Sequence, residues 1–324
     1  MRQAVTPSGT RWRRRSAPAS DQTVRVSNAD RVVFPDVGLT KGDVVAYYEA
    51  VAPFMLPLLS GRPLTLQRYP KGLAGPGFMQ KNAPAHYPDE IGVWEVPKSD
   101  GGTTRYPVVT TESAIPYLAN QGTITFHAWT STVDHPQEPD WLVIDLDPLE
   151  GDAESARQVA LATRSILDVY HLDSLPVATG SKGYHIWVGL EPGVGYGPVA
   201  RAAHALSAFI ERSVPELATG EFLKKERGGR VFIDWLRNGF SSTVAVPFSL
   251  RPRPRATVAM PITWEELAST DPDAWTLRPA LNRVPEAPPF PKPSALPLDE
   301  IEAAASELGI DLDTTFDRFG RTRS

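Results

Sequence analysis

The 324-residue chain contains no cysteine, which excludes disulfide bonds and thiolate metal sites. It has no apolar run close to the roughly 18 residues that a membrane-spanning helix needs. The opening stretch MRQAVTPSGTRWRRRS also lacks the apolar segment of a secretory signal. These absences predict a cytoplasmic protein with no membrane partner.

Charge of either sign is modest overall, with a formal net charge of -5. The basic residues are nevertheless clustered, in RWRRR (11–15), KKERGGR (224–230) and RPRPR (251–255), whereas residues 286–317 are mainly acidic. Local fields matter more than net charge for a phosphate ligand, although short basic runs are also common on solvated surfaces. Charge alone therefore leaves nucleic-acid binding open.

Helical and strand-like patterns alternate along the chain, which predicts a mixed α/β fold of the α+β type. Helices are expected at 40–59, where Thr40 can act as the N-cap, and at 152–170. The strand-like runs are TITFHAW, WLVIDLD, LPVATGSKGYHIWVGL and RVFIDWL.

Composition divides the chain into four parts. Residues 1–23 are polar and arginine-rich and are predicted to form a disordered basic arm, either a solubilising arm or one that touches phosphates. Residues 24–284 form the globular domain. Residues 285–297 belong to a stretch with six prolines and are predicted to be a semi-rigid linker. Residues 298–324 are predicted to be a C-terminal helix and tail, the helix either docked on the domain or free for a partner.

The stretch WLVIDLDP at 141–148 places two carboxylates in an apparently buried strand. Because side chains alternate along a strand, the even-numbered apolar residues face one way while Asp145 and Asp147 face the other. Paired like charges repel unless a cation bridges them, so the pair is a candidate metal site. The alternative is a solvated strand end, or acids that cap a helix.

Two further stretches carry polar groups suited to a phosphate. In TGSKGYHIWV, Gly180 and Gly183 flank Ser181 and Lys182, which allows backbone amides and a lysine to approach a phosphate closely. The spacing is not that of a P-loop, and a tight hairpin turn with an exposed lysine is the alternative. His185 follows on the next strand.

In RVFIDWLRN, Asp234 lies between apolar neighbours on a strand. Either Arg237 pairs with it structurally, or it completes a metal site with Asp145 and Asp147. Three carboxylates that hold two divalent ions suit in-line attack on phosphorus, and oxygen ligands favour magnesium or manganese.

The motifs described so far, in their order along the chain, are similar to those of a known family. The order DLD, SKGYH, FIDWLRNG and VPFSLR, together with SNADRVVFPDVGLTK, GRPLTLQRYPKG and TITFHAW, resembles the polymerase domain of bacterial ligase D, a branch of the archaeo-eukaryotic primase superfamily. The resemblance covers about residues 24–284. It implies a primase-like catalytic core whose antiparallel or mixed sheet carries the acids, plus a smaller N-terminal module. No ligase lysine motif and no phosphoesterase domain are seen, so we expect a stand-alone, monomeric polymerase module.

The resemblance also implies roles for individual residues. The catalytic and metal-binding residues, for two Mn2+ or Mg2+ ions, are Asp145, Asp147 and Asp234. The nucleotide-binding residues are His127, Thr179, Ser181, Lys182, His185, Arg237 and Arg251. The residues that hold the 5′-phosphate of DNA are Asn28, Arg31 and Lys41, and Phe78 contacts the template. Thr179 stands where the family often has serine, Met79 replaces a second phenylalanine, and Arg31 replaces a common lysine.

The implied function is template-dependent addition of ribo- or deoxyribonucleotides to fill short gaps or extend primers at 5′-phosphorylated DNA breaks, with a separate ligase or the Ku protein as partner at the bacterial nucleoid. One alternative is a primase that starts chains de novo. Another is a non-catalytic module that grips a 5′-phosphate and recruits a ligase. A metal-dependent nuclease could use the same acids.

Overall fold

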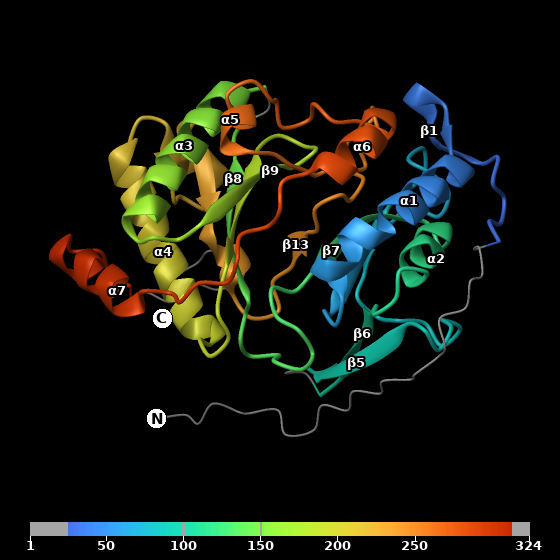
Figure 1. Cartoon of the computed structure of the whole chain (residues 1–324), viewed down its shortest axis with the longest axis horizontal. Coiled ribbons are helices and arrows are strands. Elements are labelled where there is room, and N and C mark those ends of the chain that lie inside the picture. The colour runs from blue at the N-terminus through green and yellow to red at the C-terminus, as the bar shows by residue number, and fades with distance from the viewer. Residues whose placement is uncertain (1–24, 99–100, 150, 313–324) are drawn as a thin grey trace.

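The computed structural model describes residues 25–98, 101–149 and 151–312 (Figure 1). The basic arm expected at 1–23 and the end of the tail expected at 298–324 lie outside these ranges. Figure 1 shows two halves side by side. The first half contains helices α3 (Ala153–Val169) and α4 (Tyr196–Ser213), and the second half contains helices α1 (Lys41–Leu59) and α2 (Ala114–Asn120). Within the described residues, no helix has both the length and the apolar character needed to cross a membrane.

The first half is built on a six-stranded sheet in the order β11-β12-β8-β10-β9-β14. Its pairs are antiparallel except for the parallel pair β11 and β12. The strands are β8 (Trp141–Asp147), β9 (Ser174–Ala178), β10 (Tyr184–Gly189), β11 (Ala218–Thr219), β12 (Val231–Asp234) and β14 (Met260–Pro261). The fold class expected from the alternating patterns is therefore confirmed.

Helices α3 (Ala153–Val169) and α4 (Tyr196–Ser213) cover one face of this sheet (Figure 1). Helix α3 begins where expected, because the Asp152 side chain accepts a hydrogen bond from the Ser155 amide. The apolar face of β8 packs under these helices, with Leu142 and Ile144 fully buried. The opposite face of β8, which carries Asp145 and Asp147, is left for the second half of the molecule.

The second half is built on a four-stranded antiparallel sheet in the order β13-β7-β3-β4. Its strands are β3 (Leu64–Arg68), β4 (Phe78–Gln80), β7 (Thr123–Ala128) and β13 (Val244–Ala245). Helices α1 (Lys41–Leu59) and α2 (Ala114–Asn120) pack together on this side. Thr40 caps α1 through a capping box with Asp43, as its position predicts.

Two tyrosines of α1 fix the segment that follows β13. The Tyr47 hydroxyl donates to the Phe248 carbonyl at 2.8 Å, and the Tyr48 hydroxyl accepts from the Leu250 amide at 2.8 Å. Phe248 has φ 68°, an uncommon left-handed conformation that these contacts hold. Arg251 follows directly, so its position depends on packing against a helix about 200 residues earlier.

The other elements are shorter. They are β1 (Val32–Phe34), β2 (Leu39–Thr40), β5 (Gly92–Pro97), β6 (Thr103–Val108), α5 (Trp264–Leu267), α6 (Leu277–Arg283), α7 (Leu298–Glu307) and four 3-10 turns, η1 (Pro35–Val37), η2 (Lys224–Glu226), η3 (Trp235–Asn238) and η4 (Val284–Glu286). Buried apolar side chains of both halves form one continuous cluster.

The proline-rich stretch predicted to be a linker runs alongside the first sheet. Ser294 exchanges backbone hydrogen bonds with Gly189 and Glu191, at 3.1 and 3.0 Å. The Phe290 ring lies edge-on to Trp141 and Trp187, with centroid separations of 5.6 and 5.9 Å. Because proline favours extended backbone, such a segment can follow a strand without joining it fully. Beyond it, α7 packs on α4.

Candidate active site

Three adjacent strands bring the predicted acids and one histidine together. Asp145 on β8 is paired in register with His185 on β10 and with Asp234 on β12. His185 Nε2 lies 3.4 Å from Asp145 Oδ1. All three side chains are at most 18% exposed. The residues are therefore neighbours because their strands are neighbours, which the period-two pattern of each strand alone could not reveal.

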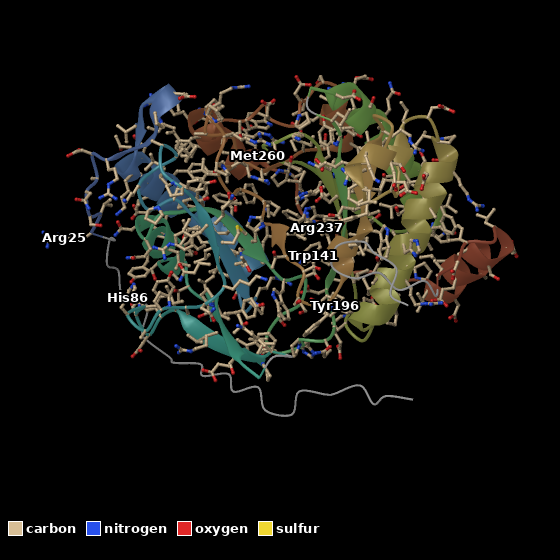
Figure 2. All side chains as sticks on the ribbon, turned by 180° about the vertical axis from the view of Figure 1, so that it is seen from behind. Arg25, His86, Trp141, Tyr196, Arg237 and Met260 are labelled. Atoms are coloured by element: carbon tan, nitrogen blue, oxygen red, sulfur yellow. The ribbon has the colours of Figure 1, made fainter. Side chains whose placement is uncertain are left out.

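Arg237 lies between the two carboxylates. Its Nε is 2.9 Å from Asp234 Oδ2 and 3.3 Å from Asp145 Oδ2. The residue comes from the turn η3, which begins directly after β12. Figure 2 shows Arg237 and Trp141 near the middle of the molecule, between its two halves. The sequence left open whether Arg237 pairs with Asp234 or Asp234 joins a metal site, and this contact is the first of those two arrangements.

The side chain of Asn238 fixes that turn to β8. Its amide nitrogen donates to the Val143 carbonyl at 2.8 Å, and its amide oxygen accepts from the Val143 amide at 2.8 Å. Strand β12 pairs with β8 only from Asp145 onward, so Asn238 replaces a missing strand at this point. The Trp235 ring also stacks on His204 of α4, with centroids 4.3 Å apart. The backbone that carries Arg237 is consequently held on both sides.

The two carboxylates differ in proton affinity. Burial would raise the pKa of Asp145, but His185, Arg237 and Arg251 outweigh it and lower the pKa to about 2. For Asp234, burial outweighs the opposing effect of Arg237, and together with the negative charge of Asp145 it raises the pKa to about 6. At neutral pH both groups are ionised, and the site holds two adjacent negative charges.

Asp147 points to the same side of β8 but has a different partner. Its Oδ2 lies 3.7 Å from Arg227 Nη1, and 44% of its side chain is exposed. The Arg227 guanidinium also lies over the Phe232 ring, 3.9 Å from its centroid. The three acids expected to hold metal therefore lie on the same face of the sheet without forming a closed set.

The groups around the carboxylates include oxygens that a divalent cation could use. Among the described residues, no three histidine or acidic side chains form a ready metal cage. Asp234 Oδ1 is nevertheless buried without a hydrogen-bond partner, and both neighbouring Oδ2 atoms already face one cationic group. Carboxylate oxygens of this kind suit magnesium or manganese. The residues present thus fit such an ion, once the arginine gives up its contacts.

The loop between β9 and β10 is tightly constrained. The Thr179 hydroxyl donates to the Gly183 carbonyl at 2.7 Å and accepts from the Ser181 amide at 3.2 Å, while the Gly180 amide donates to Pro272. A Cβ on Gly183 would lie 1.8 Å from the Leu146 carbonyl oxygen, so only glycine fits there. The amides expected to approach a phosphate are thus partly used within the protein, and Thr179 shapes the loop.

Lys182 and Ser181 line a cavity of about 400 Å³ together with Arg253, Arg255 and the start of α3. Arg253 Nη2 donates to the Ser181 hydroxyl at 2.5 Å. Asp271 and Asp273 also border this cavity, and Asp273 pairs with Arg255 at 3.1 Å. The walls are rich in cationic groups, as a phosphate ligand requires.

His127 on β7 reaches this region from the second sheet. Burial, followed by the charges of Arg251, Arg237 and His185, lowers its pKa to about 3. Its Nε2 is buried without a hydrogen-bond partner. Arg251 donates to the Thr179 carbonyl at 3.1 Å. The predicted nucleotide-binding residues therefore gather from both sheets, and the imidazole is neutral.

The residues predicted to hold a 5′-phosphate share a separate cavity of about 230 Å³, which Asn28, Arg31 and Lys41 line. Lys41 Nζ donates to the Ser27 carbonyl at 2.7 Å, and Arg31 Nη1 donates to Pro70 at 2.6 Å. Burial, and then the charge of Arg31, lower the pKa of Lys41. Among the residues that the structure describes, no acid lines this cavity. Two cations that repel each other there are an arrangement that an anion would relieve.

Phe78 on the edge strand β4 is 49% exposed, and Met79 beside it is 47% exposed. The Arg68 guanidinium lies 5.6 Å from the Phe78 ring centroid and also lines the cavity of Asn28 and Lys41. An exposed aromatic ring on a sheet edge suits base stacking. The platform and the cavity are thus joined by one arginine.

The family model of the LigD primase-polymerase domain matches residues 40–289. The chain belongs to the LigD primase-polymerase family. It is 36% identical over 258 residues to the multifunctional non-homologous end joining protein LigD of Mycobacterium bovis, covering 77% of this chain and 34% of that protein. It is 29% identical over 264 residues to the bifunctional LigD of Bacillus subtilis, covering 81% of this chain and 42% of that protein.

Among solved structures of this family, the polymerase domain from Mycobacterium tuberculosis ligase D in complex with DNA aligns with a TM-score of 0.76 and 32% identity, covering 87% of this chain and 99% of that one. The family resemblance and fold expected from the motifs are therefore confirmed. The chain spans about a third of the length of the mycobacterial relatives it matches.

Three residues at the site of this family member were not singled out from the sequence. Arg227 was seen only as part of a basic run, Asn238 only as part of the FIDWLRNG motif, and Arg68 only within GRPLTLQRYPKG. Asn238 offers one usable signal, because a polar residue directly after a strand and a short turn often bonds to backbone. For Arg227 and Arg68 the signal is tertiary, since their partners lie on other elements.

Proposed function

We propose that the chain is a template-dependent nucleotidyltransferase that fills short gaps at 5′-phosphorylated breaks in DNA. The observation that carries this proposal is the shared cavity of Asn28, Arg31 and Lys41, which comes in addition to a carboxylate site. A carboxylate site alone would also suit a nuclease. The second, cationic cavity favours an enzyme that holds the 5′-phosphate at the downstream edge of a gap while it extends the primer from the other edge.

The family supports the same proposal. The matched relatives are named as non-homologous end joining proteins, and the aligned polymerase domain is in complex with DNA. We extend DNA binding and break repair to this chain on that basis. A separate DNA ligase would seal the filled gap, and a Ku-type protein would bring the enzyme to the ends.

The carboxylates would hold the divalent ions of the reaction. Asp145, Asp147 and Asp234 are the proposed ligands of two Mn2+ or Mg2+ ions, which when bound supply activation of the primer 3′-hydroxyl and neutralisation of the triphosphate. Asp145 is ionised well below neutral pH and is oriented by His185. The orphaned Asp234 Oδ1 is the oxygen with free capacity.

Residues around the carboxylates would bind the nucleotide. His127 is neutral, so its unpartnered Nε2 can form one directional hydrogen bond to the triphosphate or sugar without adding charge. Lys182, His185, Arg251 and the Ser181 hydroxyl would hold the phosphates. Thr179 would act by shaping the loop that carries Ser181 and Lys182.

Two further residue sets would hold the DNA. Lys41, Arg31 and Asn28 would bind the 5′-phosphate at the downstream edge of the gap, and Phe78 would stack on the template base. Because Arg68 contacts both the Phe78 ring and the phosphate cavity, an occupied cavity would also steady the template platform.

The test is primer extension on a short-gapped DNA with a 5′-phosphate or a 5′-hydroxyl, in either metal and with ribo- or deoxyribonucleotides. We expect addition that the phosphate stimulates and that Asp145→Ala abolishes, while binding of gapped DNA persists. An Asn282→Ala variant, at an exposed site on α6, is the matched control and should extend normally.

The outcomes separate the alternatives. No addition under any condition, with tight binding to the phosphorylated gap, would replace the polymerase by an end-recognition module. Products from an unprimed template would add primase activity. Addition retained by Asp145→Ala would refute the assignment of the carboxylates.

A further inference from the structure

We propose that Arg237 is a built-in counter-ion, which closes the carboxylate site of the metal-free protein and is displaced when a divalent cation binds. This inference rests on the metal site of the proposed function. It concerns what the chain itself places between Asp145 and Asp234 before any metal arrives.

Arg237 holds the atoms that a bridging ion would need. Asp145 has two carboxylate oxygens, and His185 faces Oδ1 while Arg237 faces Oδ2. On Asp234, Arg237 again faces Oδ2, at 2.9 Å. A cation held by Asp145 and Asp234 would therefore compete with the guanidinium for these Oδ2 atoms, with Asp234 Oδ1 as the unoccupied oxygen. Metal and arginine compete for one position.

The side chain is placed so that it can leave. It is 46% exposed, whereas the two acids it joins are 18% and 13% exposed. Its backbone is fixed by the bonds of Asn238 to Val143. Release therefore requires rotation of one long side chain toward solvent, with no movement of the sheet or the turn.

The charges at the site favour replacement of the Arg237 guanidinium by a divalent cation. Two ionised carboxylates and one arginine leave a net negative site, which attracts a divalent cation. Once the cation is bound, it neutralises the two carboxylates and the guanidinium is free. Arg237 already lies near enough to His127 for its charge to lower the pKa of that histidine, so the freed group stays beside the nucleotide-binding residues. Metal binding would thus supply a cation to the triphosphate.

The test measures Mn2+ binding to the full chain without DNA or nucleotide, by electron paramagnetic resonance of the free ion. We expect Arg237→Gln to bind Mn2+ roughly fivefold more tightly than the unaltered protein, since it removes a competing ion pair. Arg237→Lys keeps the positive charge but loses the forked donors of the guanidinium, so its affinity for Mn2+ should lie between those of the other two proteins. In thermal unfolding, first in chelator and then in Mn2+, the metal should raise the unfolding temperature of Arg237→Gln more than that of the unaltered protein.

Arg255→Gln is the matched control. It also removes an arginine paired with an aspartate, Asp273 at 3.1 Å, but that aspartate is not one of the proposed metal ligands. If simple repulsion of the ion were the cause, both glutamine variants would tighten binding equally, and the proposal would fail. It would also fail if the unaltered protein bound Mn2+ and Arg237→Gln bound it no more tightly. No Mn2+ binding by any of these proteins would overturn the metal site of the proposed function as well.

Discussion

Replacing Asn238 by alanine tests the idea that one side chain stands in for a strand. Asn238 is fully buried, and its side-chain amide satisfies both backbone groups of Val143, at 2.8 Å each. The same amide nitrogen also donates to the Trp235 carbonyl at 3.0 Å. Asn238→Ala removes all three hydrogen bonds. Strand β12 has already turned away at that point, so no other backbone can replace them.

The expected loss follows from the groups left unpaired. A buried backbone donor or acceptor without a partner costs about 1–3 kcal/mol, and the small space left by the side chain admits some water to lower this. For three such groups the free energy of unfolding should fall by about 3–5 kcal/mol. That is a large part of the roughly 5–15 kcal/mol that is typical of folded proteins. Asn238→Leu should also be destabilised, because it fills the space but leaves Val143 unpaired.

The assay is urea unfolding followed by tryptophan fluorescence in the presence of chelator. With a slope of about 3 kcal/mol per molar urea, the midpoint of Asn238→Ala should fall by about 1 M or more. Asn282→Ala, on the exposed side of α6, is the control and should stay within about 0.5 kcal/mol. A midpoint for Asn238→Ala within the range of that control would refute the reasoning.

Three further predictions concern other parts of the site. Lys41→Ala should weaken binding to a 5′-phosphorylated gap roughly tenfold, to the level of the 5′-hydroxyl gap, and lower the salt slope by about 1 in fluorescence anisotropy; an unchanged preference for the phosphate would rule out this contact. Gly183→Ala should lower stability by more than about 3 kcal/mol, because its Cβ would meet the Leu146 carbonyl at 1.8 Å, while Gly197→Ala, with open space around its Cβ, should change the thermal midpoint little. Because the folded pKa of Asp234 is raised to about 6, the stability this group contributes is present below its unfolded pKa of 3.8 and is lost as pH rises through 6. Asp234→Asn should therefore gain stability over the unaltered protein between pH 4 and 7 in urea unfolding with chelator, and a difference that stayed constant with pH would contradict the shift.

Local patterns predicted the elements of the fold well. The alternation of WLVIDLD matches β8, and Thr40 caps α1 as its position indicates. The motifs around Asp145 and Asp234 also identified the family correctly. These predictions worked because each depends on neighbours within one segment, or on the order of segments along the chain.

The tertiary contacts of the site could not be predicted from the sequence. That Arg237 would join Asp145 to Asp234 depends on the register between β8 and β12, which no single stretch of sequence encodes. The Gly180 amide is used up by the carbonyl of Pro272, about 90 residues further along. The linker expected at 285–297 packs on the sheet because Phe290 finds aromatic partners there.

The packing of Phe290 on the sheet predicts how this position should vary among related sequences. The family model ends at residue 289, so Phe290 lies just outside it, yet its ring fills one volume together with Trp141 and Trp187 of the catalytic sheet. A smaller residue at one of these positions opens a space that a larger residue at another can fill. Relatives of this chain that retain a similar segment should therefore vary at the three positions in a correlated way.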